Sequence, residues 1–122
     1  MFKGFLMLIR IYHNPSCSKS RQALSYLRDK SDHIEVIEYL KKPLEFSELE
    51  ELLDSLGGEP REIMRKKELA YKEAGLSDTS LSKRELIEAI VDHPIILQRP
   101  IVVKGSKAII ARPVENLKDF IF

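Results

Sequence analysis

The chain has 122 residues, with 20 lysines and arginines against 19 aspartates and glutamates, for a net charge of +1. This length suits one domain with its own core, and the balanced charge argues against bulk binding of nucleic acid or of an anionic membrane surface. The single cysteine excludes an intramolecular disulfide framework and is typical of a reducing, cytoplasmic setting. No stretch approaches the length of a membrane-spanning helix.

The N-terminal residues are apolar as far as Ile9, but this run breaks at Arg10. No small-residue cleavage pattern follows, so we do not expect a signal peptide. Met7 is a candidate natural start, which leaves residues 1–6 as an extension with little structural role.

The first part of the chain has the pattern of a β-α-β unit. Leu8–Tyr12 is apolar apart from Arg10 and predicts a buried strand, and Ile34–Tyr39 predicts a second one. Between them a helix is expected directly after Cys17, with its apolar face formed at i, i+3, i+4 and i+7 by Ser20, Ala23, Leu24 and Leu27. Such a unit implies two parallel strands joined by a right-handed crossover.

A helical insert is expected at about residues 44–92. Ser47 with Glu50 has the pattern of a capping box and precedes a stripe of leucines at 49, 52, 53 and 56, which Gly57-Gly58 ends. Pro60 suits the start of a further short helix. Ser82 with Glu85 predicts a second capping box and a helix that His93-Pro94 stops.

The segment 65–80 between these helices is highly charged, and we expect short helices and loops there. Its expected apolar anchors are Leu69, Tyr71 and Leu76.

The C-terminal part predicts a β-hairpin and a last helix. Ile101–Val103 and Ala108–Ala111 are the two strands, Lys104–Lys107 is the turn, and Pro113 opens the helix. The sum is a single α/β domain spanning 1–122. It has a thioredoxin-like layout, in which a mixed four-stranded sheet (β-α-β, helical insert, β-β-α) is flanked by helices.

Cys17 lies where the first predicted strand gives way to the first helix. The amide groups that begin a helix have no backbone partner, and they and the helix dipole favour a thiolate or a bound anion. Such settings lower a cysteine pKa from about 8.5 to about 3.5–7.5. A lone cysteine is as often a small buried hydrophobe, but the neighbours of Cys17 are serines, Lys19 and Arg21, which are not a core segment.

Two further features restrict the chemistry of this thiol. Position 20 is serine, so Cys17 has no local disulfide partner and needs an external thiol to resolve any intermediate. A phosphatase-like loop would carry an arginine six positions after the cysteine, and that position is Ala23.

Five other residues are candidates for the same site. Arg65, Arg99 and Arg112 would supply forked donors for a tetrahedral oxyanion if they converged on Cys17, although each alone is commonly a solvated surface residue. His13 could tune the thiol or be a hydrogen-bonded turn residue, and Ser20 could donate its hydroxyl to the thiolate or be an ordinary helix N-terminal serine. The three histidines and Cys17 have no metal-ligand spacing, so we expect no metal.

These residues closely resemble the glutaredoxin-dependent arsenate reductase family, in a collinear match from about Leu8 to Phe120. The motifs that carry the resemblance are His13-Asn14-Pro15-Ser16-Cys17-Ser18-Lys19-Ser20-Arg21, Arg65-Lys66, His93-Pro94, Arg99-Pro100-Ile101-Val102-Val103 and Arg112-Pro113. The resemblance implies a thioredoxin-like core with a helical insert and a cis peptide bond between Arg99 and Pro100.

The resemblance also implies a mechanism. Cys17 would attack arsenate and form a covalent adduct, glutathione would add to the arsenic, and glutaredoxin would reduce the adduct so that arsenite leaves. Arg65, Arg99 and Arg112 match the oxyanion-binding arginines of the family, and His13 and Ser20 match loop positions that tune the cysteine. Glutathione would be a co-substrate, with no bound cofactor.

Two alternatives to an arsenate reductase stay open. One is a non-catalytic redox-sensing module that binds a protein partner such as RNA polymerase; relatives of that kind typically carry Cys-x-x-Cys at this loop, and Ser20 speaks against it. The other is a reductase for a different small oxidised thiol adduct.

Overall fold

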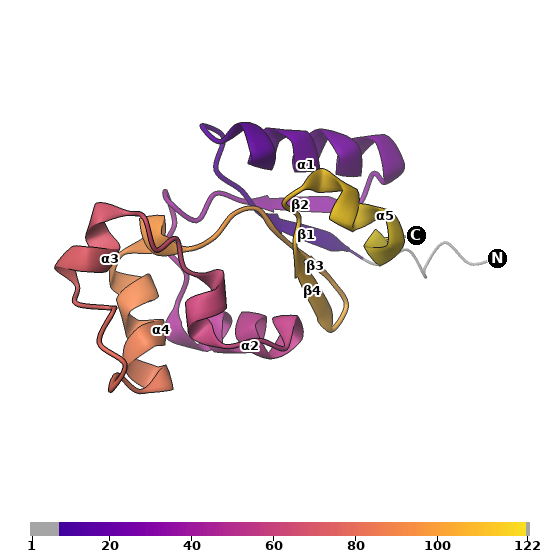
Figure 1. The fold of residues 1–122 in the computed structure, drawn as a ribbon. Coiled ribbons are helices and arrows are strands. Elements are labelled where there is room, and N and C mark those ends of the chain that lie inside the picture. Colours follow the sequence, from indigo (N-terminus) through magenta and orange to yellow (C-terminus); the bar gives the residue numbers. More distant parts are fainter. Residues whose placement is uncertain (1–7, 122) are drawn as a thin grey trace. The chain divides into compact units, whose positions relative to one another are not determined.

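The computed structural model describes residues 8–121 (Figure 1). These residues form two compact units, one made of residues 8–39 together with 99–121, and the other of Leu40–Gln98. The residues of the expected insert, 44–92, all lie in the second unit, and a single domain spanning both units stays a prediction. The expected extension at residues 1–6 lies outside the described residues.

The first unit is built on a mixed sheet of four strands. They are β1 (Ile9–Tyr12), β2 (Ile34–Ile37), β3 (Ile101–Lys104) and β4 (Lys107–Ile110), in the order β2-β1-β3-β4. β1 pairs with β2 in parallel, and β3 pairs with β1 and β4 antiparallel. This confirms the predicted β-α-β and β-β-α halves of a thioredoxin-like sheet.

Two helices cover one face of this sheet (Figure 1). They are α1 (Ser18–Lys30) and α5 (Leu117–Ile121), the latter preceded by a 3-10 turn at Val114–Asn116. The four residues predicted for the inner face of α1 are all buried. Each fully buried leucine in this core contributes about 1.5–3 kcal/mol. The buried core residues are Ile9, Ile11, Ala23, Leu24, Leu27, Val102, Ala111 and Leu117.

The second unit is helical. It contains α2 (Phe46–Leu56), α3 (Leu69–Glu73) and α4 (Lys83–Asp92), with 3-10 turns at Pro60–Ile63 and Pro94–Ile96. α2 contacts α4, and both 3-10 turns contact α4 as well.

The two predicted capping boxes have different outcomes. The box at Ser82 is confirmed: the Ser82 hydroxyl accepts a hydrogen bond from the Glu85 N–H at 3.1 Å, and the Glu85 carboxylate accepts one from the Ser82 N–H at 2.9 Å. The box at Ser47 is wrong, because α2 begins two residues earlier, with Glu45 as N-cap and Glu48 as its partner.

Hydrophobic residues on either side of the cap explain this earlier start. With Glu45 as N-cap, the positions that a hydrophobic staple joins are Leu44 and Leu49, and both are buried. A cap at Ser47 would assign these positions to Phe46 and Glu51, which cannot form such a contact.

Two smaller predictions also need correction. Leu69 is not an anchor, since it is 68% exposed, whereas Tyr71 is 7% exposed. Side chains two positions apart on a helix point in directions about 200° apart, so only one of these two side chains can face the interior.

The hairpin turn is shorter than expected. Gly105 has a positive φ of 62° and allows a tight turn that leaves Lys104 and Lys107 paired.

Arg61 joins three parts of the second unit. Its guanidinium donates hydrogen bonds to the Tyr71 hydroxyl at 3.2 Å, to the carbonyl of Leu76, and to the carbonyl of Asp78 at 2.6 Å. Forked geometry suits this role, because one planar group satisfies acceptors in several directions. Arg61 therefore ties the 3-10 turn at Pro60–Ile63 to α3 and to the loop before α4.

We expect Arg61→Ala to lower the free energy of unfolding by about 2 kcal/mol, because it removes several charge-assisted hydrogen bonds. Arg61→Lys should recover only part of this loss, since an ammonium group cannot reproduce the fork. The matched control is Glu88→Ala, which removes an exposed pair with Arg84 and should cost about 0.5 kcal/mol or less. Denaturant titration measures the free energy of unfolding of all three variants. Equal losses for Arg61→Ala and Glu88→Ala would contradict the stabilising role of the Arg61 hydrogen bonds.

Candidate active site

The cysteine loop follows β1 and is shaped by hydrogen bonds of Asn14. The side-chain oxygen of Asn14 accepts a hydrogen bond from the Ser16 N–H at 2.9 Å, and the main-chain carbonyl of Asn14 accepts one from the Cys17 N–H at 3.0 Å. The Cys17 carbonyl in turn accepts the Arg21 N–H at 3.0 Å, in the first turn of α1. Cys17 is thereby the N-cap of α1, with extended backbone angles and a half-buried side chain.

Ser20 lies in the first turn of α1, next to the loop, and is fully buried. Its hydroxyl oxygen accepts a hydrogen bond from the Asn14 N–H at 3.0 Å and lies 2.6 Å from Nδ1 of His13. The structure thus brings together two predicted tuning residues, His13 and Ser20. Donation of the Ser20 hydroxyl to the thiolate stays a prediction.

Arg21 holds the exposed side of the same loop. Its guanidinium donates to the carbonyl of Pro15 at 2.8 Å. Sequence reasoning assigned no role to Arg21 or to Asn14. A signal for Asn14 is present, because an asparagine followed by proline and serine is a common start of an Asx turn.

Two of the three predicted arginines reach the thiol. Arg112 donates from Nη1 to the Cys17 sulfur at 3.8 Å and to the carbonyl of Arg99 at 3.5 Å. The Arg99 guanidinium interacts with the same sulfur, and its Nε and Nη1 atoms are buried. The peptide bonds Arg99–Pro100 and Arg112–Pro113 are both cis, the first of them as the resemblance implied.

The two arginines meet because they flank the same hairpin. β3 and β4 are antiparallel, so the residue before β3 and the residue after β4 lie at one end of the pair. The Ala111 N–H donates to the Pro100 carbonyl at 3.0 Å and closes this end.

The surroundings of Cys17 favour its thiolate. Burial raises the pKa of the thiol, but the backbone N–H of Ser20 and the guanidinium of Arg99 outweigh that effect. The N–H of Lys19 acts in the same direction, so the pKa of Cys17 lies below its ordinary value.

His13 is held mainly in its neutral form. Burial lowers the pKa of His13, and the nearby positive charges of Arg28 and Arg21 lower it further. The carboxylate of Glu38 acts in the opposite direction. His13 is 5% exposed, which explains why burial is the largest cause.

Arg65, the third predicted arginine, belongs to the second unit. Its N–H donates to the Ile96 carbonyl at 2.6 Å, and its Nε lies 3.6 Å from a carboxylate oxygen of Glu68. The neighbouring Met64 forms an isolated bridge with Leu97, so the backbone at Arg65 is held on both sides.

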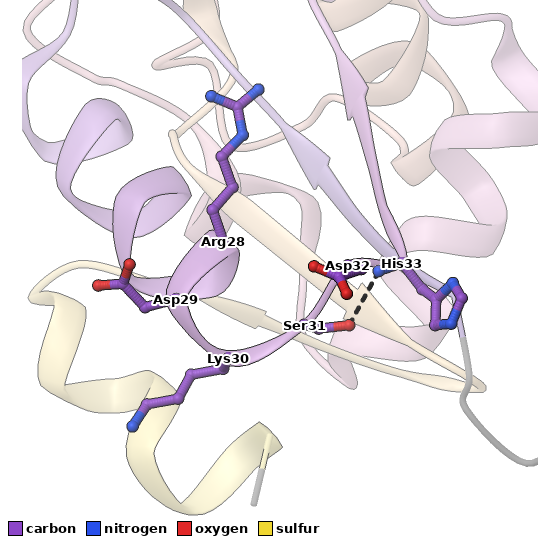
Figure 2. Close-up of a pocket in the computed structure, with 6 residues that line it drawn as sticks. All are labelled: Arg28, Asp29, Lys30, Ser31, Asp32 and His33. Atoms are coloured by element: carbon purple, nitrogen blue, oxygen red, sulfur yellow. Dashed lines mark hydrogen bonds between the residues drawn. The ribbon is translucent and has the colours of Figure 1, made fainter. Parts of the chain in front are cut away.

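The far end of α1 carries a separate hollow of about 300 Å³ (Figure 2). It is lined by Arg28, Asp29, Lys30, Ser31, Asp32 and His33. The Ser31 hydroxyl accepts the His33 N–H at 3.0 Å, which orders the turn between α1 and β2. None of the residues predicted for the thiol site lines this hollow.

Residues 8–121 contain no group of three or more histidine, cysteine or acidic side chains able to hold a metal ion. No helix in the same range has both the length and the apolar character needed to cross a bilayer.

The sheet, its two covering helices and the cysteine at a helix start define a thioredoxin-like α/β protein. A family model described as the ArsC family matches residues 12–120, which is most of the chain. The chain therefore belongs to the ArsC family.

Individual relatives agree with this assignment. The "Uncharacterized protein YfgD" of Escherichia coli is 46% identical over 114 residues, covering 93% of this chain and 96% of the relative. An "Arsenate reductase" of Neisseria meningitidis is 46% identical over 111 residues, covering 90% and 95%. A solved structure named "Arsenate reductase from Vibrio cholerae" superposes with a TM-score of 0.90 at 41% identity, covering 94% of this chain and 98% of its own.

We expect alkylation of Cys17 to show a pH midpoint below the ordinary value of about 8.5. Arg99→Ala should move this midpoint upward by about half a unit to one unit, because it removes a positive charge that stabilises the thiolate. Lys30→Ala, in the last turn of the same helix α1, is the control and should leave the midpoint unchanged. The midpoint is obtained from rates of iodoacetamide reaction across pH. An unchanged midpoint in Arg99→Ala would refute the role of Arg99 in stabilising the thiolate.

Proposed function

We propose that this protein reduces arsenate to arsenite through a covalent adduct on Cys17, with glutathione and glutaredoxin as the source of electrons. The observation that carries the proposal is the position of Arg99 and Arg112 at the Cys17 sulfur. Two guanidinium groups beside a thiolate suit a nucleophile whose substrate is an oxyanion. Membership of the ArsC family and the relatives named as arsenate reductases support this substrate.

The first step is nucleophilic. The Cys17 thiolate attacks arsenic(V), an S–As bond forms, and one arsenate oxygen leaves as water after protonation. Arg99 and Arg112 offset the negative charge of the oxyanion, which would otherwise repel the thiolate. Arg65 is proposed as a third oxyanion-binding residue on the basis of the resemblance.

The second step transfers electrons. The thiol of glutathione displaces another oxygen from arsenic, and a glutaredoxin thiol then attacks the glutathione sulfur. A mixed disulfide forms between glutaredoxin and glutathione, and the electron pair of the broken bond between arsenic and the glutathione sulfur stays on arsenic, which is reduced from arsenic(V) to arsenic(III). Water then hydrolyses the bond between arsenic and the Cys17 sulfur, which releases arsenite and regenerates the Cys17 thiol. The external thiols are necessary because Cys17 is the only cysteine in the sequence, so it has no internal partner.

The loop residues would support the nucleophile. Ser20 and His13 are proposed to tune the thiol through their mutual hydrogen bond, with no resident cofactor or metal. A reaction that draws on glutathione and glutaredoxin fits a reducing compartment, and we propose a cytoplasmic location on that ground.

The proposal predicts arsenite production by the purified protein with arsenate, glutathione, glutaredoxin and a regenerating system. Cys17→Ser should abolish it, because a hydroxyl is not ionised at neutral pH and is a weak nucleophile. Arg99→Ala and Arg112→Ala should raise the KM for arsenate about 10-fold or more, the effect of losing about 1.4 kcal/mol of binding. Lys30→Ala serves again as the distant control.

The competing redox-sensing function predicts a different result in the same assay. A non-catalytic module that binds a protein partner would release no arsenite. Its Cys17 would form a mixed disulfide only when oxidised glutathione is supplied, by an exchange that releases one reduced glutathione. Activity that persists in Cys17→Ser would contradict both functions.

A further inference from the structure

Two side chains hold opposite ends of one peptide group in the cysteine loop. The peptide between Pro15 and Ser16 donates its N–H to the Asn14 side-chain oxygen at 2.9 Å. The carbonyl of the same peptide accepts a hydrogen bond from Nη1 of Arg21 at 2.8 Å. Asn14, which precedes the peptide, and Arg21, in the first turn of α1, therefore act on one planar unit.

This peptide is the middle one of a tight turn. The Cys17 N–H donates to the Asn14 main-chain carbonyl at 3.0 Å, which closes a turn of four residues. Proline suits the second position of turn types I and II, which differ in the direction of their middle peptide. Type II needs a positive φ at the third position, and within residues 8–121 only glycines have one. The middle peptide therefore has the direction found in a type I turn.

A reversal of this peptide would break both side-chain bonds at once. The cis peptide bonds of the described chain are those before Pro100 and Pro113, so the peptide in the turn is trans. In a trans peptide the N–H and the carbonyl point in opposite directions, so half a rotation takes one away from Asn14 and the other away from Arg21. Asn14 is buried, and loss of this donor in a buried setting costs free energy.

The same turn sets where the thiol meets α1. Cys17 is both the last residue of the turn and the N-cap of α1. The Asn14 N–H donates to the Ser20 hydroxyl oxygen at 3.0 Å, which ties the turn to the first turn of the helix. The backbone N–H groups of Ser20 and Lys19 act on the Cys17 sulfur and favour its thiolate. A turn that loses its shape would move the sulfur relative to these amides.

We propose that Asn14 and Arg21 are positioning residues for the Cys17 nucleophile. Together they hold the peptide between Pro15 and Ser16 in one orientation, and so keep the thiol at the start of α1. They act through the backbone of the loop and not on the substrate. An effect on arsenate reduction rests on the proposed function, whereas the coupling between the loop and the thiol does not.

The first test follows hydrogen exchange of the Ser16 amide. Asn14→Ala should speed this exchange about 10-fold, because it removes the acceptor. Arg21→Ala should also speed it, although the Arg21 bond is to the carbonyl, because it releases the other end of the same peptide. Lys19→Ala removes a charge of the same sign from the first turn of α1 and should leave the exchange unchanged. Full protection of the Ser16 amide in Arg21→Ala would overturn the shared hold on this peptide.

The second test measures the pH midpoint of Cys17 alkylation. Asn14→Ala should raise the midpoint by about half a unit, because the thiolate loses its fixed place beside the helix amides. Asn14→Ser, whose hydroxyl can accept the same N–H, should restore part of this shift. Ser16→Gly should raise the midpoint with Asn14 and Arg21 both present, since glycine after proline favours the opposite orientation of the peptide.

Ser31→Ala is the matched control for the midpoint. The Ser31 hydroxyl accepts the N–H of the residue two positions later, His33, at 3.0 Å, but at the far end of α1. Loss of this bond should leave the midpoint unchanged.

An unchanged midpoint in Asn14→Ala, or an equal shift in Ser31→Ala, would overturn the proposal. If Asn14→Ala does not fold, Ser16→Gly decides the question, and an unchanged midpoint in that variant has the same meaning. Neither test contains arsenate, so failure here is distinguishable from failure of the proposed reductase activity.

Discussion

The unpaired amides at the start of α1 are the constraint on which the site depends. A helix must leave its first N–H groups without backbone partners, and here a sulfur lies among them. The loop before the helix holds the sulfur there through backbone and side-chain hydrogen bonds of Asn14. Burial of the thiol opposes ionisation, so the amides and the Arg99 guanidinium are needed to outweigh it. The same arrangement that stabilises a thiolate offers donors to an incoming anion.

The parts of this site that are local in sequence could be predicted. A strand pattern, a lone cysteine among polar residues and an immediate helical period together place Cys17 at a helix start. The hairpin pattern likewise predicts that Arg99 and Arg112 lie near each other, since they flank its two strands. Their approach to Cys17 could not be read from spacing, because it depends on β3 pairing with β1 across the whole of Leu40–Gln98. Only the resemblance to a known family suggested it.

The sequence predictions that the structure corrects failed for physical reasons that a sequence pattern does not contain. Ser47 and Glu50 satisfy a capping rule, yet burial of Leu44 and Leu49 selects the register that begins at Glu45. Leu69 is apolar, but the short helix α3 has room to bury only one side, and Tyr71 takes it. Each case was decided by tertiary context.

The division of the first unit into two distant pieces of chain has a consequence for folding order. β1, α1 and β2 are contiguous, whereas β3 and β4 must return from beyond Gln98 to join them. Closing so long a loop costs entropy before new contacts can offset that cost. The pairing of β3 with β1 is therefore slower than the formation of local structure. A nascent chain that has emerged only as far as Gln98 carries the cysteine loop without Arg99 or Arg112. Its thiol is therefore made early in synthesis, while the two guanidinium groups that complete its surroundings arrive with the last strands.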